Sequence, residues 1–384
     1  MNIKEIGKDC SGCNSCVQIC PKKCIIMEKD SNGFLYPKID EKMCIDCGIC
    51  LDRCPIKKEK SIEANDLDCY VAYNKDIEER LTSSSGGIFS LIAKKVLNQG
   101  GVVFGAAFNN DFQVKHIYIE EESQLYKLKG SKYVQSEIGD SFIKTKKFLD
   151  EGRIVLFSGV ACQIEGLKSF LKKDYENLLT IDVLCHGVPS PKVWNKYLNE
   201  IRNVYDDKIS FINLRDKSKG WTKYSYKVSM NNNIFLISHS DDIYSKVFLS
   251  NICLRNSCYS CKFKSFPRCS DITIGDAWEI EKYAKDLNDD KGTSIIIINS
   301  KNGGILFSLI KNDLVFRKQN LNTILPEEAD SRRSVRKNRN YDLFFSQLDN
   351  CSLKELSKYN DDRTLFERIK GKVKRIIKIV LGKK

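Results

Sequence analysis

The stretch Cys10-Ser11-Gly12-Cys13-Asn14-Ser15-Cys16-Val17-Gln18-Ile19-Cys20-Pro21 has a counterpart further along the chain, Cys44-Ile45-Asp46-Cys47-Gly48-Ile49-Cys50-Leu51-Asp52-Arg53-Cys54-Pro55. Both stretches have the spacing C-x2-C-x2-C-x3-C-P. Three closely spaced thiols allow one short loop to surround a metal group, and the proline turns the chain away after the fourth thiol. We therefore expect residues 1–60 to fold as one module with two similar halves.

This repeated spacing is typical of two-cluster ferredoxins, in which three cysteines hold one 4Fe–4S cluster and the fourth reaches the other cluster. The alternatives are a zinc site or disulfides, but zinc usually takes two separated pairs of ligands. The pattern predicts one cluster on Cys10, Cys13, Cys16 and Cys54, and a second on Cys44, Cys47, Cys50 and Cys20. Cys24 and Cys69 are left over, and we expect both to be structural.

The composition indicates the cellular compartment. The chain has 384 residues and 17 cysteines, and its first residues do not resemble a signal peptide. Cysteines in such a chain are more often metal ligands in a reducing compartment than disulfides. No apolar run is long enough to span a bilayer. We therefore expect a cytoplasmic protein of two or three domains.

The positive charge is concentrated at the end of the chain. The net charge is +13, and residues 363–384 carry nine Lys or Arg against one Glu. The rest is nearly balanced, so we expect no nucleic-acid partner. Residues 365–381 have the period of a basic amphipathic helix. This helix could lie on an anionic membrane surface, which would make the protein peripheral, or dock on protein.

The residues that follow the ferredoxin-like module predict a mixed α/β core. The turn at 82–87 precedes an amphipathic helix at 88–97, and its serines and glycines can either cap that helix or leave N–H groups free for a phosphate. A buried strand is expected at 101–108, antiparallel strands over 209–240 and two further strands at 271–276 and 293–299.

A βαβ unit is the most informative part of this core. The pattern predicts a strand at 153–157, a turn at 158–160, a helix at 161–171 and a strand at 179–184, with Cys162 after the first strand and Cys185-His186 after the second. The carboxyl ends of parallel strands meet at one edge of a sheet, where ligands usually bind. Each thiol is therefore either part of a site or a buried, inert cysteine.

A third group of cysteines follows the antiparallel strands. Cys253, Cys258 and Cys261 form a C-x4-C-x2-C run, which can hold three corners of a third 4Fe–4S cluster. The fourth thiolate would come from Cys185 or Cys269. Zinc is the alternative.

Several motifs in order resemble one family, the beta subunit of coenzyme F420 hydrogenase/dehydrogenase. They are Ser84–Gly87, Lys129–Ser136, Phe157–Ile164, Cys185–Pro191 and Ser270–Asp276, together with the third cysteine group. The resemblance divides the chain into a two-cluster ferredoxin-type domain at 1–60, the family's N-terminal domain at 70–150, its C-terminal domain at 151–315 and a helical basic tail at 316–384. The expected fold class is α+β, a ferredoxin-like module followed by a mixed α/β flavin-binding core and a C-terminal amphipathic helix.

The resemblance also implies cofactors and residues. Family members hold a flavin, usually FAD, beside an iron–sulfur cluster, and archaeal members exchange electrons with the deazaflavin coenzyme F420. It implies that Cys185 joins Cys253, Cys258 and Cys261 as a ligand. The candidates for flavin binding are Ser85, Gly86, Gly87, Lys132 and Cys162.

The expected function is that of an iron–sulfur flavoprotein oxidoreductase. Its partner would be a redox protein or a small-molecule acceptor. The alternative is a non-catalytic electron-transfer or docking subunit in a surface-polysaccharide biosynthesis system.

Overall fold

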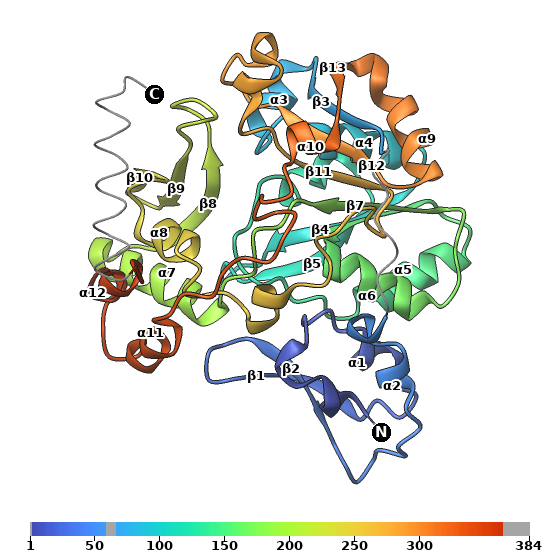
Figure 1. Ribbon diagram of the computed structural model, residues 1–384, viewed down its shortest axis with the longest axis vertical. Helices are drawn as coiled ribbons and strands as arrows, with labels where there is room; N and C mark the ends of the chain where they lie inside the picture. Colours follow the sequence, from blue (N-terminus) through green and yellow to red (C-terminus); the bar gives the residue numbers. More distant parts are fainter. Residues whose placement is uncertain (1, 59–66, 364–384) are drawn as a thin grey trace.

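The computed structural model describes residues 2–58 and 67–363. Figure 1 shows a small N-terminal module at one end, a large central sheet with helices on both faces, and a separate three-stranded sheet at one side. The prediction of a mixed α/β fold behind a ferredoxin-like module is confirmed.

The N-terminal module repeats its backbone as well as its cysteines. It contains η1 (Ile3–Asp9), α1 (Ser15–Ile19), the hairpin β1 (Ile25–Lys29) and β2 (Leu35–Ile39), α2 (Ile49–Asp52) and η2 (Pro55–Lys57). The residues before the two short helices, Asn14 and Gly48, both adopt the left-handed conformation, with φ of 67° and 73°. Gly12 and Asp46, two residues earlier, do the same, with φ of 74° and 47°. The equivalent positions of the repeat therefore turn in the same way, as the sequence predicted.

The central sheet has eight strands in the order β13-β3-β12-β11-β7-β6-β4-β5. The inner strands β11, β7, β6 and β4 run parallel, and the remaining pairs are antiparallel. The strands are β3 (Cys69–Asn74), β4 (Val102–Phe108), β5 (Val114–Ile119), β6 (Val155–Val160), β7 (Leu178–Val183), β11 (Ile272–Asp276), β12 (Ser294–Ile298) and β13 (Leu314–Gln319).

Helices cover both faces of this sheet because the buried strand residues alternate between them. Val103 and Leu156 belong to one apolar cluster, which includes α4 (Ile88–Leu97) and α9 (Lys301–Ile310). Their neighbours Phe104 and Phe157 belong to another, which includes α5 (Ser141–Asp150) and α6 (Ala161–Leu171). The shorter elements are α3 (Ile77–Thr82), η3 (Glu122–Lys127), η4 (Asn256–Ser260), η5 (Ile280–Lys282), η6 (Lys285–Leu287), η7 (Lys311–Asp313) and α10 (Leu321–Ile324).

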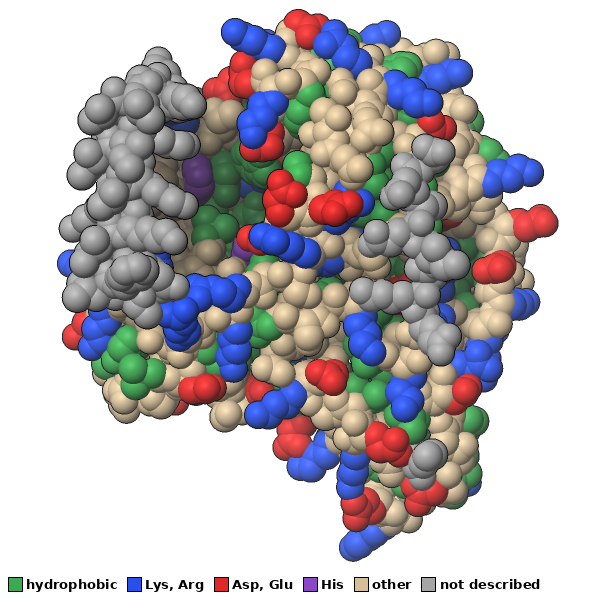
Figure 2. Space-filling model, viewed as in Figure 1, with side chains coloured by type: hydrophobic (Ala, Val, Ile, Leu, Met, Phe, Trp, Pro, Cys, Tyr) green, Lys and Arg blue, Asp and Glu red, His purple; other side chains and the backbone are tan. Residues whose placement is uncertain are grey.

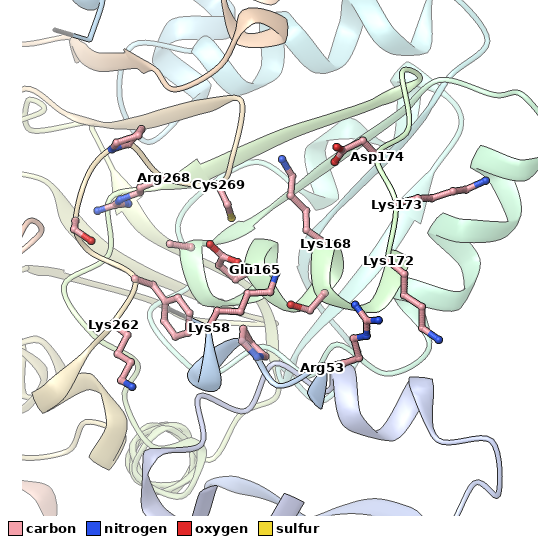
Figure 3. Close-up of a pocket in the computed structure, with 16 residues that line it drawn as sticks. Arg53, Lys58, Glu165, Lys168, Lys172, Lys173, Asp174, Lys262, Arg268 and Cys269 are labelled. Carbon is pink, nitrogen blue, oxygen red and sulfur yellow. Dashed lines mark ion pairs between the residues drawn. The ribbon is translucent and has the colours of Figure 1, made fainter. Parts of the chain in front are cut away.

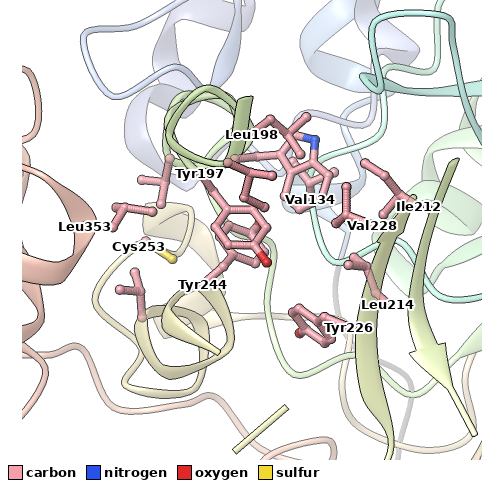
Figure 4. Packing of buried hydrophobic residues seen from close by; sticks show 14 of the residues in the cluster. Val134, Tyr197, Leu198, Ile212, Leu214, Tyr226, Val228, Tyr244, Cys253 and Leu353 are labelled. Atoms are coloured by element: carbon pink, nitrogen blue, oxygen red, sulfur yellow. The ribbon is translucent and has the colours of Figure 1, made fainter. Parts of the chain in front are cut away.

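The three-stranded sheet has its own apolar core. It consists of β8 (Ile209–Asp216), β9 (Ser225–Met230) and β10 (Ile234–Ser238), paired antiparallel. The helices beside it are α7 (Pro191–Tyr205), α8 (Ile243–Leu249), α11 (Tyr341–Gln347), α12 (Leu353–Leu356) and η8 (Ser357–Tyr359). Figure 4 shows this core, in which Tyr197 and Tyr244 pack between α7, α8 and the sheet.

The structure confirms the βαβ unit, because β6, α6 and β7 follow one another and the two strands pair in parallel. The predicted turn at 158–160 is wrong, since β6 continues to Val160. Its last residues pair with Asp182 and Val183 of β7, and this pairing keeps the backbone extended.

The predicted domain borders fall within shared structure. Strands from 70–150 and from 151–315 lie in the same sheet, and β13 crosses the border at 315. The predicted amphipathic helix at 365–381 lies outside the described residues. Among residues 2–58 and 67–363, no helix is long and apolar enough to cross a membrane.

Candidate functional site

The structure brings thiols of the two cysteine stretches of the N-terminal module close to one another. Burial raises the pKa of the Cys13 thiol to about 12, and the nearby thiols of Cys10 and Cys54 raise it further. Burial also raises the pKa of Cys50, and the thiol of Cys20 adds to this effect. Cys54 therefore lies with the first stretch and Cys20 with the second.

Cys24 is not an isolated structural cysteine. Its Sγ lies 3.4 Å from the Sγ of Cys20, and it also interacts with Cys44. It is buried at the start of the hairpin, beside the second group of thiols. Cys69, the other cysteine left over by the pattern, is fully buried in β3, away from both groups.

A further quartet of thiols comes together in the core, and it differs from the one that the sequence predicted. Burial raises the pKa of Cys162 far above its ordinary value, and Cys261, Cys185 and Cys258 raise it further. Burial likewise raises the pKa of Cys185 to about 11 and that of Cys258 to about 12, again with contributions from neighbouring thiols. Cys162 belongs to α6, Cys185 to the loop after β7 and Cys258 to η4. Cys261 directly follows η4.

The backbone explains why these distant segments meet. The parallel pairing of β6 and β7 places Cys162 and Cys185 at the same sheet edge. The loop after β7 is then tied to the segment before η4, because Arg255 N donates to Val188 O at 2.8 Å and Pro189 bridges to Leu254.

Cys253, which the sequence predicted as a ligand, lies elsewhere. Its side chain is fully buried in the apolar core between α7, α8 and α12, as Figure 4 shows, near Tyr244. Burial raises its pKa to about 12, and no neighbouring thiol contributes to that shift. Its backbone carbonyl accepts a hydrogen bond from Ser190 N at 2.9 Å. The backbone pairing beside Leu254 thus holds Cys253 in the core, away from the quartet.

Cys269 also lies apart from the quartet. Burial raises its pKa well above the ordinary value, and its nearest charged neighbours are Glu165 and Lys168 of α6. Of the two candidates for the fourth position, the structure therefore places Cys185, and not Cys269, with Cys258 and Cys261.

Helix α6 joins the core quartet to the N-terminal module. Cys162 lies at its start and interacts with Cys13. One turn later, a Cβ on Gly166 would lie 2.7 Å from the Cβ of Cys13 and 3.0 Å from its Sγ. Only a residue without a side chain allows the two segments to approach this closely.

Arg255 fixes the orientation of the module on the core. It is fully buried, and it donates from Nε to Cys10 O at 2.7 Å and from Nη2 to Leu35 O at 2.9 Å. Its guanidinium lies 4.0 Å from the centre of the Tyr36 ring. A buried arginine with these partners cannot move without leaving unpaired donors, so the two parts are held together.

A large cavity opens next to the quartet. Its volume is about 770 Å³, and Cys162 and Cys185 lie in its wall together with Ser11 and Gly12 of the N-terminal module. Figure 2 shows a hollow between the three-stranded sheet and the central sheet, with hydrophobic and histidine side chains inside it. A cavity of this size is suited to a cofactor-sized ligand.

One end of the cavity offers groups that suit an anion. Burial lowers the pKa of Lys132 to about 7. Its Nζ donates to the carbonyls of Lys127 and Lys129, at 3.1 Å and 2.8 Å, and among the described residues it has no carboxylate partner. Ser85 and Gly87 line the same cavity.

Gly86, another candidate for flavin binding, does not line the cavity. Its N–H donates to Ser294 Oγ at 2.9 Å, and a Cβ there would lie 2.6 Å from Ala72 O. Glycine at this position therefore allows close packing against β3 and β12, and its N–H is not free for a phosphate.

Sequence reasoning missed the aromatic wall of the cavity. Arg215 pairs with Asp276 through two contacts of 2.8 Å, and its guanidinium lies 4.3 Å from the Tyr224 ring and 4.9 Å from the Trp278 ring. Asp276 ends β11, so its position at a strand end was the one available signal. The other residues of this wall, Arg215, Tyr224 and Trp278, come from segments without any recognisable motif.

His116 is a second residue that the sequence did not indicate. It lines the cavity, and burial lowers its pKa to about 4, so the ring is neutral at pH 7. Nε2 lies 3.1 Å from Ser158 O and Nδ1 lies 2.7 Å from Ser136 Oγ. Since a carbonyl can only accept, Nε2 carries the proton and Nδ1 accepts from the serine hydroxyl.

Comparison with known protein families gives matches to two parts of the chain. Residues 9–58 match the family of 4Fe-4S dicluster domains. Residues 152–323 match the family described as the C terminus of the beta subunit of coenzyme F420 hydrogenase/dehydrogenase. The first match supports two 4Fe–4S clusters in the N-terminal module, as predicted.

Similar individual proteins match mainly in the module. The chain is 44% identical over 46 residues to an uncharacterized ferredoxin of Methanocaldococcus jannaschii, covering 12% of this chain and 58% of the ferredoxin. It is 38% identical over 56 residues to the pyruvate synthase subunit PorD of Methanothermobacter marburgensis, covering 14% of this chain and 59% of PorD. The chain thus spans less than three-fifths of the length of these curated relatives.

One solved structure, of the F420-reducing NiFe hydrogenase complex from Methanosarcina barkeri, is similar over 79% of this chain and 92% of the matched chain. The two chains are 18% identical, and the TM-score of the superposition is 0.44. The comparisons therefore match residues 9–58 to a 4Fe-4S dicluster domain and residues 152–323 to the C terminus of the coenzyme F420 hydrogenase/dehydrogenase beta subunit.

Proposed function

We propose that this protein is an iron–sulfur flavoprotein oxidoreductase in which electrons pass between the N-terminal module and a flavin through a third 4Fe–4S cluster. Cys162, Cys185, Cys258 and Cys261 would hold the third cluster, and the cavity of about 770 Å³ would hold the flavin, FAD. The observation that carries this proposal is the position of the quartet, in which Cys162 interacts with Cys13 and both Cys162 and Cys185 line the cavity.

The chemistry of the quartet suits a cationic metal group. Burial and mutual repulsion both disfavour thiolates here, while Lys264 and Arg268 lower the pKa of Cys185 only in part. Ligation by iron would supply the positive charge that stabilises the thiolates. No three His, Cys, Asp or Glu side chains in the described part of the chain lie close enough to hold one metal ion. A cluster spreads its ligands over four irons, so it does not need such close approach.

The cavity has the features that a flavin dinucleotide requires. Lys132 is a half-buried amine with backbone carbonyls as partners, and a phosphate would favour its charged ammonium form. In the same cavity, the rings of Tyr224 and Trp278 flank the Arg215 guanidinium and form an aromatic wall.

The protein's own residues position and shield these groups. When bound, 4Fe–4S clusters carry single electrons and a flavin can exchange two as a hydride. Arg255 holds the module on the core, and Gly166 allows α6 to approach Cys13. His116 keeps its proton on Nε2 in a bond to Ser158 O, so it contributes a neutral polar wall and not a general acid.

Cofactor content tests the proposal. Iron, acid-labile sulfide and flavin would be measured on protein purified without oxygen. We expect about twelve irons and one flavin per chain. Lys132→Gln should lower the flavin content and spare the iron, whereas Lys127→Gln, which removes an exposed lysine outside the cavity wall, should change neither. About eight irons and no flavin in the unaltered protein would contradict the proposal.

The acceptor can be a small molecule or another protein subunit. PorD is by its name a subunit of pyruvate synthase, so a protein partner is a reasonable expectation for this chain. Turnover with reduced donor and coenzyme F420, compared with turnover on a redox protein, separates the two cases. No observation on the described residues favours a docking subunit in surface-polysaccharide biosynthesis or contact with a membrane.

A further inference from the structure

A second cavity lies between the N-terminal module and the core, apart from the proposed flavin cavity. Its volume is about 470 Å³. Figure 3 shows that it is enclosed by α6 and the residues after it, by the segment that holds Arg268 and Cys269, and by the module near Arg53 and Lys58. The proposed redox chemistry does not use this cavity.

The charge of its wall is strongly positive. Seven Lys or Arg residues line it, against two acidic residues, Glu165 and Asp174. Lys58 pairs with Glu165 at 3.8 Å, and Arg53 pairs with Asp52 outside the wall at 3.1 Å. Lys168, Lys172 and Lys262 have no carboxylate partner within residues 2–58 and 67–363.

Two residues of the wall have buried polar atoms that lack a partner. Arg268 is 6% exposed, and it donates from Nη1 to Asp182 and from Nη2 to Ser331 O at 2.8 Å. Its Nε is buried without a hydrogen bond among the described residues. Ser169 on α6 is 2% exposed, and its hydroxyl also has no hydrogen-bond partner among the described residues. Both atoms have almost no accessible surface, so they lie behind the cavity wall and do not face a ligand inside it.

The distribution of the cations between the module and the core is a further reason to expect a bound anion. Arg53 and Lys58 belong to the module, while Lys168, Lys262 and Arg268 belong to the core. Cations on the two sides of a joint repel each other. An anion between them would remove this repulsion and hold the module on the core.

We propose that this cavity is a binding site for a small phosphate-bearing anion, of the class of pyrophosphate and nucleoside polyphosphates. Arginine and lysine are the usual partners of such groups, and the volume suits a small ligand. The ammonium groups of Lys168, Lys172 and Lys262 are the donors for phosphate oxygens. The inference goes beyond the proposed function and does not depend on it.

Titration calorimetry with inorganic pyrophosphate on the full-length, cofactor-loaded protein tests the site, with inorganic phosphate and ADP in parallel. Lys132→Gln reports any binding in the other cavity, because Lys132 lines that cavity and not this one. We expect saturable binding with one site per chain, and about tenfold weaker binding for the double variant Lys168→Gln/Lys172→Gln. Lys282→Gln, an exposed lysine outside the wall, and Lys132→Gln should bind as the unaltered protein does.

Ser265→Leu separates a built site from general attraction of anions, because it changes no charge and adds bulk to the cavity wall. We expect it to weaken binding several-fold while the folded structure and iron content stay unchanged. Binding without saturation, or equal weakening in Lys282→Gln, would overturn the proposal. If polyglutamate bound to this face while pyrophosphate did not, the surface would be a docking face for an acidic protein, and the proposal would be wrong.

Discussion

The two places where cysteines gather are built in different ways. In the N-terminal module, the ligand candidates lie in two short loops whose backbone turns alike, as Asn14 and Gly48 show. In the core, Cys162 and Cys185 are brought together by parallel strands and meet Cys258 and Cys261 from a distant segment. A short repeated loop specifies its own cysteine arrangement, whereas a quartet made from separate elements depends on the whole sheet.

The strongest test of this comparison removes single thiols. If the proposed third cluster is present, Cys162→Ala and Cys185→Ala should each lose about four of twelve irons, because each removes one of its proposed ligands. Cys253→Ala and Cys269→Ala should retain all the iron. Iron and acid-labile sulfide analysis measures the loss. Loss of iron from Cys253→Ala with none from Cys162→Ala would restore the arrangement that the C-x4-C-x2-C run predicted.

Lowering the pH should reduce the stability of the core, because His116 is buried there as a neutral ring. The N-terminal module contains no histidine. The pKa of His116 in the folded protein is about 4, against 6.5 ordinarily. The unfolded chain therefore binds the proton more tightly than the folded protein does. The contribution of the neutral His116 ring to stability is complete above pH 6.5 and is lost as the pH falls toward 4. The loss is at most about 3 kcal/mol.

His116→Gln should remove this pH dependence. Thermal unfolding followed by circular dichroism at pH 5 and pH 7.5, with unaltered protein beside the variant, measures it. An equal decrease in both proteins would show that other groups cause the acid sensitivity.

The joint between the two regions can be tested at Gly166. Gly166→Ala places a methyl group 2.7 Å from the Cβ of Cys13, and we expect a loss of about 1–3 kcal/mol in stability. Gly304→Ala is the matched control, because it also lies in a helix but has open space around its Cβ. It should be neutral or stabilise by up to about 1 kcal/mol. Denaturant unfolding of the two variants gives the difference, and similar stabilities would mean that the contact is not tight.

The smallest effect is expected at Cys253. It packs in the apolar core of the three-stranded sheet region, so Cys253→Ala should lower stability by about 1 kcal/mol through a small cavity. Cys351→Ala, at a half-buried position beside the same core, should lower it less. A rise in stability at Cys253→Ala, or loss of iron there, would contradict the role of a packing residue.

Much of the fold could be predicted from local patterns. The β6–α6–β7 unit follows from short buried runs separated by an amphipathic segment, and the hairpin at 231–233 follows from its three asparagines. The end of β6 was missed because Ser158 and Gly159 read as a turn, yet pairing with β7 keeps them extended. The aromatic wall around Arg215 has no motif, because it forms between segments that are far apart in the chain.

The sequence by itself determined the two N-terminal groups of cysteines, because their spacing and left-handed turns fall within single loops. It also placed Cys162 and Cys185 at one sheet edge, since parallel strands have only one carboxyl end. Only the tertiary structure decided which thiols complete the quartet. The direction of the Cys253 side chain is set by the bridge beside Leu254 and the packing of α7 and α8, and residue spacing carries no information about that packing.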